Sequence, residues 1–327
     1  MILDRFEPLD QQLLQALQLD GRASFRLLGQ VLGVSDQTVA RRYAKLRSAG
    51  RARVLGLTDP LRLGEVSWVL RIRTTPDAAL PVAQALARRE DTSWIHLTSG
   101  GTEIVCSARS PLVQDDDSLL LAKLPRTQRI VDLSAQQVLH VFHGLAESPL
   151  LKSGILGPDQ VAALTAGVPL VEPRESPVVT DEVDAAVLDV LAIDGRVPVE
   201  ELGARTGVPT STVRRRMDAL HRAGVLYYDV DFDPRRRDTG YPTMVWLSIA
   251  PADLPAAGEQ LAALPESAFV AATTGRTNLY ASLLSSGSTE VYQLISGPLA
   301  ALPGVRDIES APVLRAVKAA GSLTGRP

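Results

Sequence analysis

The sequence predicts an α+β protein with two copies of one unit in tandem. Each copy is expected to hold a winged helix-turn-helix domain followed by a ferredoxin-like βαββαβ domain. Three observations support this: an internal repeat spans the chain, each copy opens with three short helices and a strand, and each continues with strands and helices in the order βαββαβ. The predicted domains cover residues 1–62, 63–147, 181–240 and 241–327, with a linker over 148–180.

The repeat is clearest near the start of each copy. Asp20-Gly21-Arg22 recurs 174 residues later as Asp194-Gly195-Arg196. At the same offset further identical residues coincide: Asp10 with Asp184, Leu14 with Leu188, Gly33-Val34 with Gly207-Val208, Thr38-Val39 with Thr212-Val213, and Arg41-Arg42 with Arg215-Arg216. Farther on, residues 94–107 resemble residues 269–282 at an offset of 175. The chain is therefore a duplication.

Composition narrows the function classes. A length of 327 residues favours two to four domains, and 45% hydrophobic with 22% charged residues is typical of a folded protein. The formal net charge of −3 means that nucleic-acid binding would need a local basic face. One cysteine, Cys106, excludes a disulfide framework and cysteine-rich metal sites, and no cofactor motif is found. Without a signal peptide or an apolar spanning segment, we expect a cytoplasmic protein with no membrane partner.

The start of each copy has the pattern of a helix-turn-helix. In copy one Asp10 opens the first helix, Ser24 and Ser35 are the expected N-caps of the second and third, and Gly33 ends the second. The predicted buried face of the third helix is Val39, Tyr43 and Leu46, and that of its counterpart is Val213, Met217 and Leu220. Short strands over 53–57 and 225–230 are expected to form a wing in each copy.

The outer face of each third helix has a polar start and a basic body. Hydroxyls and helix N-terminal amides can bind phosphate oxygens, while Gln and Arg can read base edges in the major groove. The plainer alternative is a solvated charged face, but its repetition in two helix-turn-helix patterns favours double-stranded DNA. The predicted DNA-binding residues are Ser35, Gln37, Thr38, Arg41, Arg42 and Lys45 in copy one, and Thr210, Ser211, Thr212, Arg214, Arg215 and Arg216 in copy two.

The second part of each copy predicts the βαββαβ order. In copy one the expected elements are strand 66–73, helix 79–89, strands 94–97 and 104–108, helix 118–124, and strands 130–133 and 137–142. In copy two they are strand 244–249, helix 259–264, strands 268–273 and 279–284, helix 291–302 and strand 305–312. Between the copies, residues 148–180 are rich in Pro and Gly, with one short helix expected over 158–166.

On these residues the sequence resembles the Lrp/AsnC family of feast/famine regulators. The resemblance rests on LDQQLLQALQLDGRASFRLLGQVLGVSDQTVARR and DEVDAAVLDVLAIDGRVPVEELGARTGVPTSTVRRR, and on TTGRTNLYASLL and LPGVRDIESAPVLRAVK in the second βαββαβ domain. It implies a transcription regulator whose βαββαβ domains (RAM-type) sense a small effector, usually an amino acid. It also implies pairing of these domains, so we expect a homodimer of internally duplicated chains.

The resemblance further implies an effector site near the glycine turn of the central hairpin. The implied residues are Gly100, Gly101, Thr102 and Glu103 in copy one, and Thr274, Gly275, Arg276, Thr277 and Asn278 in copy two. Backbone N–H groups of such a turn could hold a carboxylate. The plainer alternative, that these glycines only form hairpin turns, stays open.

A second function class is an enzyme. Siroheme decarboxylases resemble this family and would need imidazole or basic groups in the sensor cleft. The candidates are His96, His140 and His143, for which the sequence offers no evident acidic partner. The two basic third helices favour the regulator, so we predict no catalytic residues.

Overall fold

The computed structural model describes residues 6–112, 119–124, 127–148, 150–172, 176–232 and 240–320. The chain forms two compact units, and each contains parts of both copies. The helix-turn-helix unit consists of Met1–Gly64 with Leu145–Asp233, and the sheet unit consists of Glu65–Gly144 with Pro234–Pro327. The two helix-turn-helix segments therefore fold together, as do the two βαββαβ segments.

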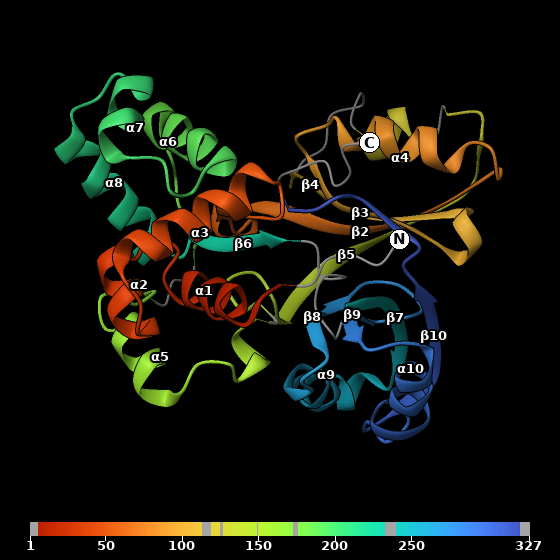
Figure 1. Cartoon of the computed structure of the whole chain (residues 1–327). Coiled ribbons are helices and arrows are strands. Elements are labelled where there is room, and N and C mark those ends of the chain that lie inside the picture. The colour runs from red at the N-terminus through yellow and green to blue at the C-terminus, as the bar shows by residue number, and fades with distance from the viewer. Residues whose placement is uncertain are drawn as a thin grey trace. The chain divides into compact units, whose positions relative to one another are not determined.

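The helix-turn-helix unit contains two sets of three helices (Figure 1). They are α1 Pro8–Leu19, α2 Phe25–Leu32 and α3 Asp36–Ser48, then α6 Glu182–Ile193, α7 Val199–Thr206 and α8 Thr210–Arg222. The predicted caps of copy one are confirmed: Ser24 Oγ accepts from Leu27 N at 3.1 Å, Ser35 Oγ accepts from Thr38 N at 3.2 Å, and Gly33 ends α2 with φ 69°. Helix α1 begins two residues before the predicted Asp10, at Pro8, whose fixed φ suits the first helical position.

Both predicted buried faces are confirmed. Val39, Tyr43 and Leu46 are 5% exposed or less and pack with the leucines of α1. Val213, Met217 and Leu220 are likewise buried, against α6 and α7. Burial of these apolar stripes fixes the face that each third helix turns outward.

The predicted strands exist, but a separate wing in each copy does not form. Strand β1, Ala52–Thr58, pairs antiparallel with β6, Leu226–Phe232, and Val54 lies opposite Val230. Each copy supplies one strand to a shared two-stranded sheet. A lone strand leaves its backbone N–H and C=O groups unpaired, and here the other copy provides the partner.

The repeated Asp-Gly-Arg turns join the two copies reciprocally. Arg22 donates from Nη1 to the carbonyl of Gly195 at 2.7 Å and from Nη2 to that of Val197 at 3.0 Å. Arg196 donates to the equivalent carbonyls of the first copy, Gly21 at 2.6 Å and Ala23 at 2.8 Å. Four charge-assisted hydrogen bonds thus relate the copies by a local pseudo-two-fold axis.

The segment predicted as a linker is packed on the first helix-turn-helix. Its helix α5, Pro158–Thr165, ends one residue before the predicted end, and Leu156 and Leu164 are buried in the core of copy one. Leu156 N donates to Gln15 Oε1 at 2.8 Å, and Gln160 Nε2 donates to the Val31 carbonyl at 2.7 Å. The breaker-rich composition therefore marks tight turns, and not a free spacer.

The sheet unit is built on one nine-stranded sheet in the order β10-β7-β9-β8-β5-β2-β4-β3-β11. The first copy provides β2 Glu65–Thr74, β3 Thr92–Thr98, β4 Glu103–Pro111 and β5 Ile130–His143 with helix α4 Ala79–Ala87. The second provides β7 Tyr241–Ile249, β8 Ser267–Thr273, β9 Leu279–Ser285, β10 Val305–Pro312 and β11 Arg315–Lys318 with helices α9 Leu254–Ala263 and α10 Ser288–Leu294. Within β2–β5 and within β7–β10, the fourth strand lies beside the first, and the third lies between the first and the second, as in ferredoxin-like domains.

Three details differ from the prediction. The two strands expected over 130–133 and 137–142 are one long strand, β5, which pairs with β2 and then with β8 and so joins the copies. The helix expected over 118–124 is a π-helical turn, Leu119–Lys123, and Ser118 lies outside the described residues. The helix expected over 291–302 is α10 followed by a π-helical turn, Ile295–Leu299, which contains Pro298.

The two groups of strands bury a common core between their inner faces. Val69 and Val105 of copy one pack in one cluster with Trp246 and Tyr280 of copy two. The opposite faces carry the helices, and Cys106 is buried on that side, as expected for a core residue. Burial raises the pKa of the Cys106 thiol to about 12, so the thiol stays protonated.

Gly195 tests the cross-copy packing of the helix-turn-helix unit. A Cβ at this position would lie 2.7 Å from Leu55 C and 2.9 Å from Gly56 N, both backbone atoms of β1. We expect Gly195→Ala to lower the free energy of unfolding by about 1–3 kcal/mol, because strand β1 must shift. Urea denaturation measures this. The control is Gly167→Ala in the same unit, where a Cβ meets open space. Equal midpoints for both variants would contradict the packing described.

Candidate functional site

The third helix of copy one presents an exposed cationic face. Arg41 and Lys45 lie one turn apart on α3, both exposed, with Gln37 one turn before them. Among the described residues none forms an ion pair with Arg41 or Lys45. At the helix start the Ser35 and Thr38 hydroxyls lie 2.9 Å apart, within the cap. Arg41, Lys45 and Gln37 are therefore free to contact a ligand.

The equivalent helix of copy two presents a similar but not identical face. Arg214 and Arg215 are exposed on α8, and Thr210 and Ser211 are exposed at its start, with Thr212 half-buried. Arg214 lies 3.5 Å from Glu200, an ion pair in which both side chains are more than half exposed. Such pairs are worth little and exchange readily with other anions. The third helix of each copy thus presents an exposed cationic face.

Arg42 and Arg216 do not lie on these free faces, contrary to the prediction. Arg42 Nη1 binds Glu7 at 2.9 Å and Asp10 at 3.0 Å. Arg216 makes the same contacts in copy two, with Asp181 at 2.7 Å and Asp184 at 3.2 Å. The Arg42 hydrogen bond holds the pKa of Glu7 below its usual range, so the pair stays ionised at neutral pH. Each arginine fastens its third helix to the first helix of the same copy.

The sequence contained a signal for this role. Arg42 stands three residues after Val39 and four before Leu46, so it belongs to the buried stripe, and Asp10 lies on the same side of α1 as Leu13 and Leu14. Arg216 and Asp184 have the equivalent positions in copy two. The identical spacing in both copies marks a structural pair.

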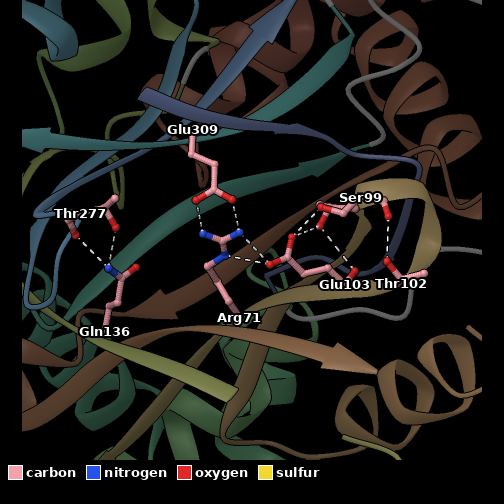
Figure 2. Close-up of polar contacts among 8 residues, drawn as sticks. Arg71, Ser99, Thr102, Glu103, Gln136, Thr277 and Glu309 are labelled. Carbon is pink, nitrogen blue, oxygen red and sulfur yellow. Dashed lines mark hydrogen bonds and ion pairs between the residues drawn. The ribbon is translucent and has the colours of Figure 1, made fainter. Parts of the chain in front are cut away.

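The glycine turn of copy one holds a buried carboxylate. Ser99, Gly100 and Gly101 have φ of 50°, 69° and 86°, and Thr102 Oγ1 closes the turn on the Ser99 carbonyl at 2.9 Å. Glu103, only 3% exposed, accepts from Ser99 Oγ at 2.7 Å and from Arg71 Nε at 2.9 Å (Figure 2). This turn therefore combines an exposed backbone with a buried, paired charge.

The polar groups of the second glycine turn are used within the sheet. Thr274 Oγ1 accepts from Gln137 N at 2.9 Å, and Thr277 accepts from Gln136 Nε2 through its carbonyl at 2.8 Å and through Oγ1 at 2.9 Å. Asn278 donates to and accepts from the backbone of Ile249. Only Gly275 and Arg276 are exposed. The sequence predicted the same role for both turns, but only the first turn has a buried carboxylate, Glu103.

The candidate histidines are not gathered into one site. His96 is on β3 and His140 and His143 are on β5, and β2 and β4 lie between these strands, a separation of roughly 14 Å from three strand spacings. Burial lowers the pKa of His96 to about 4, so its ring is neutral near pH 7. Within the described residues, no cluster of three metal-binding side chains occurs and no helix has the length and apolar character needed to cross a membrane.

Known proteins match both kinds of domain. A model of the AsnC-type helix-turn-helix domain matches residues 8–47 and 181–221, and a model of the Lrp/AsnC ligand binding domain matches residues 243–323. An uncharacterised helix-turn-helix-type transcriptional regulator of Pyrococcus abyssi is 32% identical over 141 residues, which cover 42% of this chain and 87% of that protein. The chain belongs to the Lrp/AsnC family. A further Lrp/AsnC relative, the regulator FL11 of Pyrococcus horikoshii, is 24% identical over 139 residues, 42% of this chain and 91% of FL11.

Two solved structures of the siroheme decarboxylase NirDL, one of them with an iron-uroporphyrin III analogue, match this Lrp/AsnC chain over nearly its whole length. The siroheme decarboxylase NirDL superposes with a TM-score of 0.63 and 15% identity, covering 96% of this chain and 93% of that chain. At this identity the similarity is one of fold.

Replacement of Arg42 tests whether this arginine stabilises the fold, in contrast to the exposed Arg41. We expect Arg42→Ala to reduce the free energy of unfolding by about 1–2 kcal/mol, because Asp10 would stay nearly buried without its counter-charge. The partial exposure of Arg42 keeps this below the loss of a fully buried pair. Arg41→Ala, at the adjacent position, should change the free energy of unfolding by no more than about 0.5 kcal/mol. Urea denaturation of both variants gives the comparison, and a larger loss in Arg41→Ala would refute this assignment.

Proposed function

We propose that this chain is a sequence-specific, DNA-binding transcription regulator whose binding is modulated by a small-molecule effector. Helices α3 and α8 are its recognition helices, and each reads one half-site of duplex DNA. The observation that carries the proposal is the exposed cationic face that recurs on both third helices, with Arg41 and Lys45 in one and Arg214 and Arg215 in the other. Such side chains can reach base edges and phosphates in the major groove.

The pairing of the copies supports binding to two half-sites. The reciprocal bonds of Arg22 and Arg196 and the pairing of β1 with β6 hold both helix-turn-helix segments in one unit. A dimeric regulator obtains two recognition helices by symmetry. Here one chain supplies both, and they differ in sequence: Gln37, Arg41 and Lys45 on α3 correspond to Ser211, Arg215 and Ala219 on α8. We therefore propose an imperfect inverted repeat as its target.

We further propose that the protein is not an enzyme. The alternative, a decarboxylase of the same fold, is supported by the superposition on NirDL alone. The candidate histidines lie on separated strands, and His96 is a neutral, buried ring. The two activities are distinguished by incubating the protein with siroheme: release of carbon dioxide would establish the enzyme, and its absence with selective DNA binding would establish the regulator.

The exposed arginines and lysine test the DNA assignment. Each bidentate arginine contact to a base contributes roughly 1–3 kcal/mol of discrimination. We expect Arg41→Ala to relax base preference in one half-site and Arg215→Ala in the other, while Lys45→Ala weakens all sequences alike and lowers the salt slope by about one. Binding titrations against selected and scrambled duplexes at several salt concentrations measure both effects.

The matched control is Arg88→Ala, an arginine of the sheet unit that follows α4. It should leave DNA affinity and salt dependence unchanged. If Arg41→Ala, Arg215→Ala and Lys45→Ala all bind like the unmodified protein, the two faces are only solvated and the regulator proposal fails.

We also propose that two chains associate into a homodimer. The nine-stranded sheet ends at β10 and β11, and no described strand pairs with their outer edges. Exposed strand edges are surfaces on which further chains can pair. Light scattering at micromolar concentration should give a mass near twice 35.0 kDa. A mass of 35.0 kDa at every concentration would exclude the homodimer and leave the pairing within the chain intact.

A further inference from the structure

The last turn of α3 is fastened to the other copy of the helix-turn-helix unit. Arg47 Nη2 binds Asp194 Oδ2 at 2.8 Å, while Asp194 Oδ1 accepts from Arg196 N at 3.0 Å within the Asp-Gly-Arg turn. The same turn also reaches Tyr43 of α3, because Cζ of Arg196 lies 5.5 Å from the centroid of its ring. Arginine stays protonated throughout the neutral and mildly acidic range, so the cation of this ion pair does not titrate there.

In the second copy a histidine and an aspartate occupy the positions of this ion pair. At the offset of 174, Arg47 corresponds to His221 and Asp194 to Asp20. The backbone agrees, because Arg22 N donates to Asp20 Oδ1 at 2.9 Å and the φ and ψ of Asp20, −140° and 96°, match the −147° and 99° of Asp194. Asp20 thus uses one oxygen within its turn, as Asp194 does, and among the described residues none forms an ion pair with Asp20. His221 lies in the last turn of α8, as Arg47 does in that of α3.

The surroundings of His221 control the charge of its ring. The ring is half-buried and lies nearly parallel to that of Tyr228 on β6, with an angle of 21° and 6.3 Å between their centroids. Burial lowers the pKa of His221 below its ordinary value of 6.5. The carbonyl of Pro169, through a hydrogen bond, and the carboxylates of Asp20 and Asp218 act in the opposite direction. The ring is therefore neutral at pH 7 and takes up a proton as the medium becomes acidic.

Charged and titratable groups surround His221 from every segment packed around the end of α8. They are Asp20 and Arg22 of the first turn, Asp218 and Arg222 of α8, Tyr228 of β6, and Arg62 and Glu172 beside the end of the helix. Burial raises the pKa of Tyr228 to about 12, so its hydroxyl stays neutral. Of the two carboxylates that act on the ring, Asp218 belongs to α8 itself, whereas Asp20 belongs to the other copy. A charge on His221 therefore links α8 to the first copy through Asp20.

We propose that protonation of His221 fastens the last turn of α8 to Asp20, as Arg47 fastens the last turn of α3 to Asp194 at any pH. The chain then binds its second half-site more tightly in mild acid than at neutral pH. The reason is that a recognition helix already held in place loses less conformational freedom when it binds DNA. This inference deepens the proposed function and rests on it, since it makes α8 the adjustable one of the two recognition helices.

The size of the effect follows from the exposure of the two pairs. The side chains of Arg47 and Asp194 are 55% and 18% exposed, and ion pairs of this kind contribute little. The ring of His221 is less exposed, so its charge is screened less by water and salt. Uptake of one proton on binding changes the affinity by at most about tenfold per pH unit. We expect a gain of about threefold on acidification.

The test is titration of a duplex, selected from random DNA by the full chain, at about pH 7.5 and about pH 5.5. The pH dependence is expressed relative to His221→Gln, so that contributions from the rest of the chain and from the DNA cancel. On this scale the unmodified chain should bind about threefold more tightly at the lower pH. His221→Arg should bind with the higher affinity at both pH values, because it recreates the ion pair of α3. Asp20→Asn, which keeps an acceptor for Arg22 N, should remove the gain.

The matched control is His140→Gln, at an exposed histidine of the sheet unit, which should keep the full pH dependence. An unmodified chain with the same pH dependence as His221→Gln, or an Asp20→Asn variant that retains the gain, would overturn the proposal. Thermal unfolding at both pH values shows which variants are folded. Because the pKa of His221 is lowered in the folded chain, its contribution to stability is lost as the pH falls below 6.5. If His221→Gln is unstable, the comparison of His221→Arg with Asp20→Asn takes its place.

Proton NMR of the histidine rings tests the link to Asp20 without DNA. The signal of His221 is identified by its loss in His221→Gln, and its pKa should be lower in Asp20→Asn than in the unmodified chain, because the carboxylate favours the protonated ring. An unchanged pKa would overturn the ion pair and leave the regulator. A lowered pKa in a chain that selects no duplex from random DNA would overturn the regulator and leave the ion pair.

Discussion

The exchange of structure between the two copies is the constraint on which the rest of the helix-turn-helix unit depends. In each copy one strand follows the third helix, and among the described strands its partner is the strand of the other copy. The Asp-Gly-Arg turns complete the exchange, because each arginine binds the backbone of the opposite turn and the absence of a Cβ at Gly195 lets β1 approach. Even the last turn of α3 is held across the copies, with Arg47 bound to Asp194 at 2.8 Å. The relative placement of α3 and α8 follows from contacts that neither copy can make alone.

The two copies are alike at some positions and differ at others. This difference distinguishes residues that hold the fold from residues with other roles. The ion pairs of Arg42 and Arg216 with the first helices are the same in both copies, which is expected of contacts that hold the fold. The exposed faces of α3 and α8 differ between the copies. So do the side chains at equivalent positions of the sheet, such as Arg71 on β2 and Trp246 on β7. Divergence at Lys45 and Ala219, or at Arg71 and Trp246, leaves packing intact, so these positions are free to acquire separate roles.

Local features of this chain could be predicted from its sequence, and long-range pairings could not. Caps such as Ser24 and Ser35 act within one turn of helix, and the buried stripe of Val39, Tyr43 and Leu46 follows from helical periodicity. The partner of β1, 174 residues away along the chain, leaves no trace in the composition of β1, so a wing within each copy was the natural but wrong expectation. The fusion of two expected strands into β5 has the same cause, since one strand pairs with two different neighbours along its length. In the second glycine turn, Asn278 was predicted as a ligand contact but is hydrogen-bonded to the Ile249 backbone. Only the tertiary structure reveals this contact.

The shared sheet also has a consequence for how the chain is made. Strand β1 ends at residue 58, and its partner begins at residue 226, so the ribosome must add nearly 170 residues before the two can meet. At ordinary rates of synthesis this takes roughly 10–35 s. Throughout that time the edge of β1 has no partner from its own chain, and an unpaired strand edge is a surface on which another chain can pair. The intervening sequence also contributes to the first core, because α5 packs against α1 and α2. Fusing two copies thus moves dimerisation from an encounter between molecules to an event timed by translation.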